Sequence, residues 1–286
     1  MGKRNILPPL TPEQVVELHD ELLANADRLL TAALDMLESG SLGLARSLAI
    51  LGLEESGKAI AIHERRREIA YEDEGSAFVD SRLELLWSNH QSKLALAYDF
   101  LVREEFWFGT GPSDPETNRA WLGEVEAWTR EHNELKQRGF YVDVDAQTGI
   151  LSPESAADEQ SLREVIGHVH QIGWQLRLGE HIVAKQQEEF VRATPPASEE
   201  EIARLRDAVS GFAGMDASEV DRMCEEMRAG KPAGVLNNDA YRLRLPEPGA
   251  NPFLNLGRRG YEAETRELFQ LAEQLGLNHS RDEAGE

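Results

Sequence analysis

Five side chains with complementary chemistry fall in two segments that both read as amphipathic helices. The first segment carries Glu54, Glu55 and Lys58, and the second carries His90 and Lys93. Glu55 and Lys58 interrupt an apolar helical stripe, Glu54 lies beside it, and His90 and Lys93 interrupt a second stripe of the same kind. The apolar members of the two stripes are Leu44, Leu48, Leu51, Ile62, Leu83, Leu86, Ala97 and Phe100.

These five residues would form one cluster if the two helices pack antiparallel, as consecutive helices joined by a short turn usually do. An imidazole ordinarily titrates near neutral pH, so His90 could accept or donate a proton in general acid–base catalysis. Lys58 and Lys93 would stabilise negative charge, and the two glutamates would orient the basic groups. The alternative is a satisfied internal ion-pair network without catalysis, because charges within an apolar stripe must be paired.

Helical periodicity and capping signals predict an all-α chain that positions these residues. Thr11 and Gln14 form a capping box at the start of the first helix. Alternating apolar and polar residues around a turn at 145–149 predict a small β-like excursion within 139–153. The predicted helices cover 11–38, 41–70, 77–107, 115–138 and 153–192, with shorter helices at 198–209, 217–228 and 261–275.

Composition favours a cytoplasmic protein that does not span a membrane. The 286 residues contain one cysteine, so no internal disulfide can form, and no apolar run reaches the length of a membrane span. The formal net charge of −22 argues against broad electrostatic binding of nucleic acid. Nucleic-acid chemistry would therefore need a local basic site or a transiently held substrate.

Histidines elsewhere show no metal-binding helix motif. His168, His170 and His181 lie along the last long helix at spacings that match neither HExxH nor His-x-x-x-His. We therefore expect no metal and no cofactor. Arg163 precedes His168 at the Arg-x4–6-His spacing of one nuclease superfamily, which is a weak pattern by itself.

Three segments in order resemble the AbiV-type abortive-infection family, a bacterial anti-phage branch of the HEPN superfamily of helical domains. They are LAILGLEESGKA (48–59), NHQSKL (89–94) and LKQRGFYVDVDAQTG (135–149). The resemblance covers 11–194 and implies a HEPN-like bundle of four to five helices. Residues 1–10 are expected to form an N-terminal arm, and 195–286 a C-terminal helical and loop extension of unknown role.

The resemblance implies a toxin-like, metal-independent ribonuclease that is active during phage infection and forms a homodimer. His90 would then be general base or acid, Lys58 and Lys93 would hold phosphate, and Glu54 and Glu55 would orient them. The superfamily motif is imperfect here, because seven residues separate Arg82 from His90. Either the lysines replace the arginine, or Arg163 and His168 supply the motif, or activity is lost; Arg82, Arg163 and His168 are the expected substrate-binding residues.

The partners implied are RNA as a transient substrate and a phage-encoded protein activator. A different function remains open, in which the same Glu/Lys/His cluster is structural. The acidic surface would then serve a non-catalytic protein-interaction or phage-sensing module.

Overall fold

The computed structural model describes residues 7–104, 114–146, 149–156, 158–209 and 216–244. Within these residues the regular elements are helices apart from one short hairpin, which confirms the all-α fold class. The helices of the bundle are α1 (Pro12–Glu38), α2 (Leu42–Ile69), α3 (Ser81–Ser88), α4 (His90–Arg103), α5 (Pro115–Leu122), α6 (Val125–Arg138) and α7 (Glu159–Val191). The other elements are β1 (Asp143–Asp145), β2 (Gly149–Leu151), η1 (Pro153–Ala156), α8 (Glu199–Val209), α9 (Ala217–Ala229) and η2 (Asp239–Tyr241).

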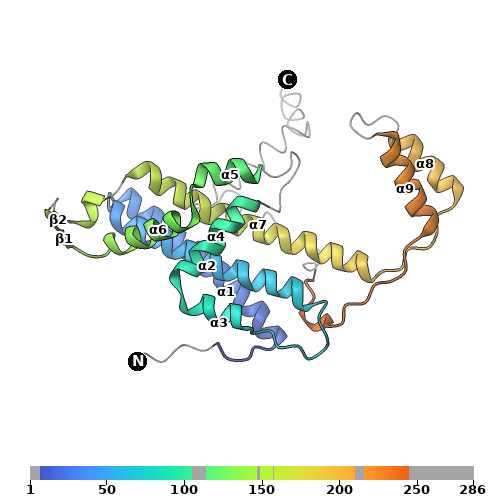
Figure 1. Cartoon of the computed structure of the whole chain (residues 1–286), viewed down its shortest axis with the longest axis horizontal. Helices are drawn as coiled ribbons and strands as arrows, with labels where there is room; N and C mark the ends of the chain where they lie inside the picture. Colours follow the sequence, from blue (N-terminus) through green and yellow to red (C-terminus); the bar gives the residue numbers. More distant parts are fainter. Residues whose placement is uncertain (1–6, 105–113, 147–148, 157, 210–215, 245–286) are drawn as a thin grey trace, which may run out of the picture.

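Helix α2 is the centre of the bundle, with α1, α4, α6 and α7 packed around it (Figure 1). Its apolar residues therefore point in several directions, and Ile50, Leu53 and Ile60 are fully buried. The capping box of Thr11 and Gln14 begins α1 as predicted. Because nearly every side of α2 is covered, a buried polar side chain on it must find a partner, either within α2 or on a neighbouring element.

The apolar stripe predicted as the core face of α2 is instead its least buried face. Leu44, Leu48 and Leu51 are only partly buried, and so are Glu55 and Lys58; Ile62 alone is fully buried. Glu54, which lies beside the stripe, is 3% exposed. A helix surrounded by four others is apolar on most sides, so one stripe does not identify its buried face.

Two predicted helices are each broken into two. The helix predicted over 77–107 breaks at Asn89, whose side chain accepts hydrogen bonds from the backbone of Gln91 and Ser92 and caps α4. The helix predicted over 115–138 breaks at Gly123, which has a φ of 81° between α5 and α6. The helix predicted from 153 begins with the 3₁₀ turn η1, and Asp158 caps α7.

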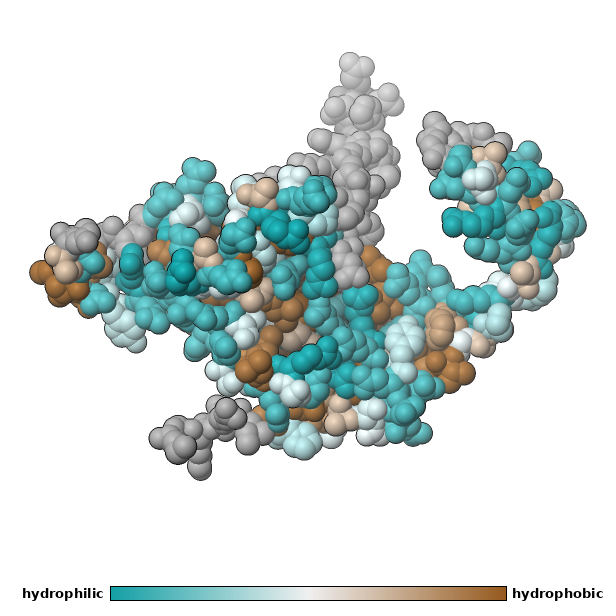
Figure 2. Space-filling view, viewed as in Figure 1, coloured by the Kyte–Doolittle hydropathy of each residue, from teal (hydrophilic) through white to brown (hydrophobic). Residues whose placement is uncertain are grey.

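The predicted β excursion is confirmed as an antiparallel hairpin in which Val144 faces Ile150 across the strands. It lies at one end of the molecule, where Figure 2 shows apolar side chains at the surface. At the other end α8 and α9 pack on each other, apart from the bundle (Figure 1). The helix predicted over 261–275 lies outside the described residues. No helix in the described part of the chain is long and apolar enough to cross a bilayer.

Candidate functional site

The carboxylate of Glu54 joins three helices through two contacts. Its Oε2 lies 2.6 Å from Nδ1 of His90 on α4, and its Oε1 accepts a hydrogen bond from Nζ of Lys136 on α6. The side chain of Glu54 is 4% exposed, whereas that of His90 is 61% exposed. A buried carboxylate therefore holds one nitrogen of an imidazole whose ring is open to solvent.

Lys58 and Lys93 lie beside this group on α2 and α4. Nζ of Lys58 donates a hydrogen bond to Glu55 Oε1 at 2.5 Å and lies 5.3 Å from the ring centre of Trp87. Lys93 is 6% exposed, and burial followed by the charge of Lys58 lowers the pKa of its ammonium group. The structure thus brings together the five cluster residues that the sequence predicted, although Glu55 and Lys58 lie at the rim.

Close backbone contacts hold the three helices at this point. A Cβ on Gly57 of α2 would lie 2.2 Å from the carbonyl oxygen of Lys93, so only glycine lets α4 approach this closely. Ser47 of α2 donates a hydrogen bond to the carbonyl of Lys136 at 2.6 Å. Gly139, at the end of α6, packs on Gly43 and Ser47. These contacts set the positions of His90, Lys93 and Lys136 relative to Glu54.

Lys136 is a member of the cluster that the sequence reasoning missed. It is 8% exposed and hydrogen-bonded to Glu54 across 82 residues of sequence. The sequence feature that points to Lys136 is the segment LKQRGFYVDVDAQTG, which carries part of the family resemblance and contains this lysine. Helical periodicity could not find it, because Lys136 lies in the last turn of a mostly polar helix.

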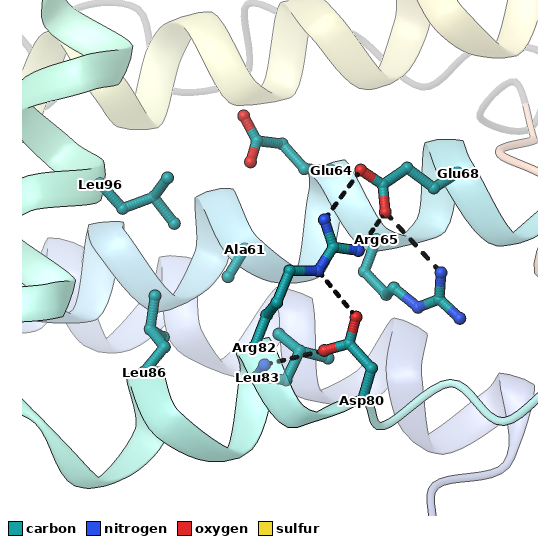
Figure 3. Close-up of a pocket in the computed structure, with 9 residues that line it drawn as sticks. All are labelled: Ala61, Glu64, Arg65, Glu68, Asp80, Arg82, Leu83, Leu86 and Leu96. Carbon is teal, nitrogen blue, oxygen red and sulfur yellow. Dashed lines mark hydrogen bonds and ion pairs between the residues drawn. The ribbon is translucent and has the colours of Figure 1, made fainter.

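Arg82 lies in a different place from the one predicted for a substrate-binding residue of this cluster. It lines a pocket of about 180 Å³ between α2, α3 and α4 (Figure 3). Its guanidinium donates to Glu68 Oε2 at 2.6 Å and to Asp80 Oδ2 at 2.9 Å, and not to His90. The two carboxylates raise the pKa of Arg82. Arg82 therefore ties α3 to α2 and does not reach the imidazole.

None of the contacts among the described residues joins Arg163 to His168. Arg163 is exposed and donates to Glu159 Oε1 at 2.7 Å. His168 is buried, with its ring centre 5.6 Å from that of Trp121 and 6.4 Å from that of Trp128. Burial lowers the pKa of His168 to about 4. A neutral imidazole in an apolar setting is poorly suited to bind phosphate, and its substrate-binding role stays a prediction.

The arrangement is suited to proton transfer next to positive charge. A carboxylate bound to Nδ1 fixes the tautomer and orientation of an imidazole, and leaves Nε2 for a reacting group. Three lysines against two glutamates give this cluster a local formal charge of +1, in a chain of net charge −22. The group of described residues with geometry suited to a metal ion lies elsewhere, on α1, α2 and α7.

A comparison with protein-family models covers most of the bundle. The family model HEPN_AbiV, described as AbiV, matches residues 14–174, which is more than half of the chain and includes every member of the cluster. No curated protein and no solved structure matches at a significant level. The matched segment carries the motifs at 48–59, 89–94 and 135–149 on which the resemblance was based. The chain belongs to the AbiV family of HEPN proteins, whose name indicates a function of the abortive-infection type.

Proposed function

We propose that this protein is a toxin-like, metal-independent ribonuclease that acts in abortive infection, with Glu54 and His90 at its catalytic centre. The observation that supports this most is the buried carboxylate of Glu54 holding Nδ1 of a solvent-accessible imidazole at 2.6 Å. Such a pair is the usual means of preparing an imidazole for general acid–base catalysis. Membership of the AbiV family is the second support.

The reaction would use the 2′-hydroxyl of RNA as the nucleophile. Nε2 of His90 accepts the proton of that hydroxyl, and the 2′-oxygen attacks the adjacent phosphorus. The bond from phosphorus to the 5′-oxygen breaks, and the leaving oxygen takes a proton from Lys93. The products are a 2′,3′-cyclic phosphate and a free 5′-hydroxyl. Burial favours proton loss from Lys93 by lowering its pKa, while Lys58 and Lys136 stabilise charge on the phosphate.

The charge of the chain bears on how RNA would be bound. A net charge of −22 disfavours tight general binding of RNA, so the substrate would be held briefly at the positive cluster. A toxin-like enzyme also needs restraint in healthy cells. We propose a homodimer that is activated by a phage-encoded protein.

The test is cleavage of total RNA by the purified full-length chain, with and without EDTA. We expect His90→Ala to lower the rate by about 100-fold or more, the usual contribution of a general acid or base. The matched control is His181→Ala, because His181 is an exposed histidine on α7 outside the cluster. A folded His90→Ala protein that cleaves RNA at the wild-type rate would overturn the proposal.

A second candidate function is a phage-sensing interaction module without catalysis. The observation that favours it is the exposed apolar surface of the hairpin, where Val144 is 74% and Ile150 is 76% exposed. Exposed apolar side chains grouped on one projecting element are typical of interaction sites. Intact RNA under all conditions, together with protection of cells by the His90→Ala variant, would favour this function.

A further inference from the structure

Three potential metal ligands from three helices meet in the interior of the bundle. They are His19 on α1, His63 on α2 and Glu180 on α7, and their ligand atoms all lie within 4.8 Å of one another. Both histidines are buried, at 0% and 1% exposure. Along α2, His63 is nine residues from Glu54, or about 13 Å at 1.5 Å per residue, so this group is separate from the proposed catalytic cluster.

The imidazole of His19 is fully buried and has no hydrogen-bond partner on either ring nitrogen. Its Nδ1 lies 3.3 Å from Oε1 of Glu180, and its ring centre lies 6.1 Å from that of His63. Buried polar nitrogens without partners are costly, and in native structures they often mark a ligand or ion. A ring nitrogen of His19 is therefore available to bind a ligand or an ion.

Glu180 is oriented toward the histidines by an arginine. Nη1 of Arg66 donates to its Oε1 at 2.7 Å, and Arg66 is itself 5% exposed. Hydrogen-bonded carboxylates of this kind are common around metal sites, where the outer partner fixes the ligand.

The local charge balance can accommodate a cation. Asp20, the exposed residue that follows His19 on α1, lies near both Glu180 and Arg66. Ionised Asp20 and Glu180 against Arg66 give a formal charge of −1. The neighbouring Arg177 is paired with Asp27 at 2.5 Å. A divalent ion would bring the formal charge of Asp20, Glu180 and Arg66 together to +1.

We propose that His19, His63 and Glu180 form a structural site for a divalent transition-metal ion of the zinc class. Two imidazole nitrogens and one carboxylate are a donor set that suits zinc, whereas calcium and magnesium prefer oxygen ligands alone. A water molecule or the second carboxylate oxygen would complete four-coordination. The ion would tie α1, α2 and α7 together at a distance from the cluster around Glu54.

The test measures metal content and stability of the purified full-length chain. We expect about one zinc per chain after dialysis against zinc and then buffer. At a 100-fold excess of free zinc over Kd, the Tm should rise by about 5–10 °C relative to the chelated protein. His63→Gln should reduce the zinc content to background, whereas His168→Gln, which changes another buried histidine on α7, should leave it unchanged.

A second variant separates ligation from a purely structural role. His19→Cys, loaded with Co²⁺, should gain a thiolate-to-metal absorption band that Co²⁺-loaded wild type lacks, because the new ligand is a sulfur atom. Wild-type protein that retains no zinc and shows no change in Tm with zinc would overturn the proposal. So would a folded His19→Cys protein without the band. Neither readout depends on RNA cleavage.

Discussion

Oε2 of Glu54 on α2 lies 2.6 Å from Nδ1 of His90, the first residue of α4. The other oxygen of the same carboxylate binds Lys136 on α6. One buried carboxylate thus serves an exposed imidazole and a buried ammonium group. Because Glu54 has both roles, its replacement should affect stability and the proposed chemistry through different partners.

The first prediction concerns the pair of Glu54 and Lys136. Glu54→Ala should lower the free energy of unfolding by about 3 kcal/mol, because it leaves the charge of Lys136 buried without its partner. The double variant Glu54→Ala/Lys136→Met should recover much of that loss. Urea unfolding of the two single variants and the double variant measures the coupling. Additive losses would show that the two residues stabilise the bundle independently.

The second prediction concerns the contact between α2 and α4. Gly57→Ala places a methyl group against the carbonyl of Lys93, so α4 must move outward. We expect a loss of about 1–3 kcal/mol in the free energy of unfolding, with loss of RNA cleavage because His90 moves with α4. Thermal unfolding and the cleavage assay measure the two effects.

A matched control for that contact is Gly167→Ala in α7. A Cβ at Gly167 meets nothing within 4 Å. Because alanine favours the helix over glycine, this change should stabilise the protein by about 0.5–1 kcal/mol and leave cleavage intact. Equal effects of the two substitutions would refute the proposed role of Gly57.

The third prediction concerns acid stability and His168. The unfolded chain binds a proton on this residue below about pH 6.5, while burial lowers the pKa in the folded state to about 4. His168 should therefore make the free energy of unfolding decrease as the pH is lowered from about 6.5 to about 4, by up to about 1.4 kcal/mol per pH unit. His168→Leu should reduce the slope by the contribution of this one residue, because His19 and His63 keep theirs, and the exposed-residue control His181→Leu should leave the slope unchanged. Urea unfolding between about pH 7 and pH 4.5 measures the slopes.

The fourth prediction concerns the exposed hairpin. Val144 and Ile150 face each other and are open to solvent, so Val144→Glu/Ile150→Lys should change the free energy of unfolding by no more than about 0.5 kcal/mol. If the hairpin senses a phage protein, the double variant should lose phage-triggered growth arrest in cells. RNA cleavage by the purified protein should remain. Phage-triggered growth arrest at the wild-type level in the variant would show that the hairpin is not needed for sensing.

Local patterns in the sequence were sufficient for most elements and for most of the cluster. The capping box of Thr11 and Gln14 and the turn residues around 145–149 depend on neighbours in the chain, and both were predicted correctly. The polar interruptions at Glu55, Lys58, His90 and Lys93 also disturb a local period, and the structure places these residues near Glu54; their catalytic role stays a prediction. The breaks at Asn89 and Gly123 were missed, since a helical stripe continues in register across a single capped or left-handed residue.

Sequence by itself determined the all-α class, the order of the family motifs, and the choice of Glu54 and four residues around it. Only the tertiary structure decided which of them are buried, because the burial of Glu54 depends on α4 and α6 closing over α2. It also placed Lys136 against Glu54 and His19 against His63 and Glu180. Side chains on helices far apart in sequence share no local pattern, so their meeting is set by the packing of the helices around α2.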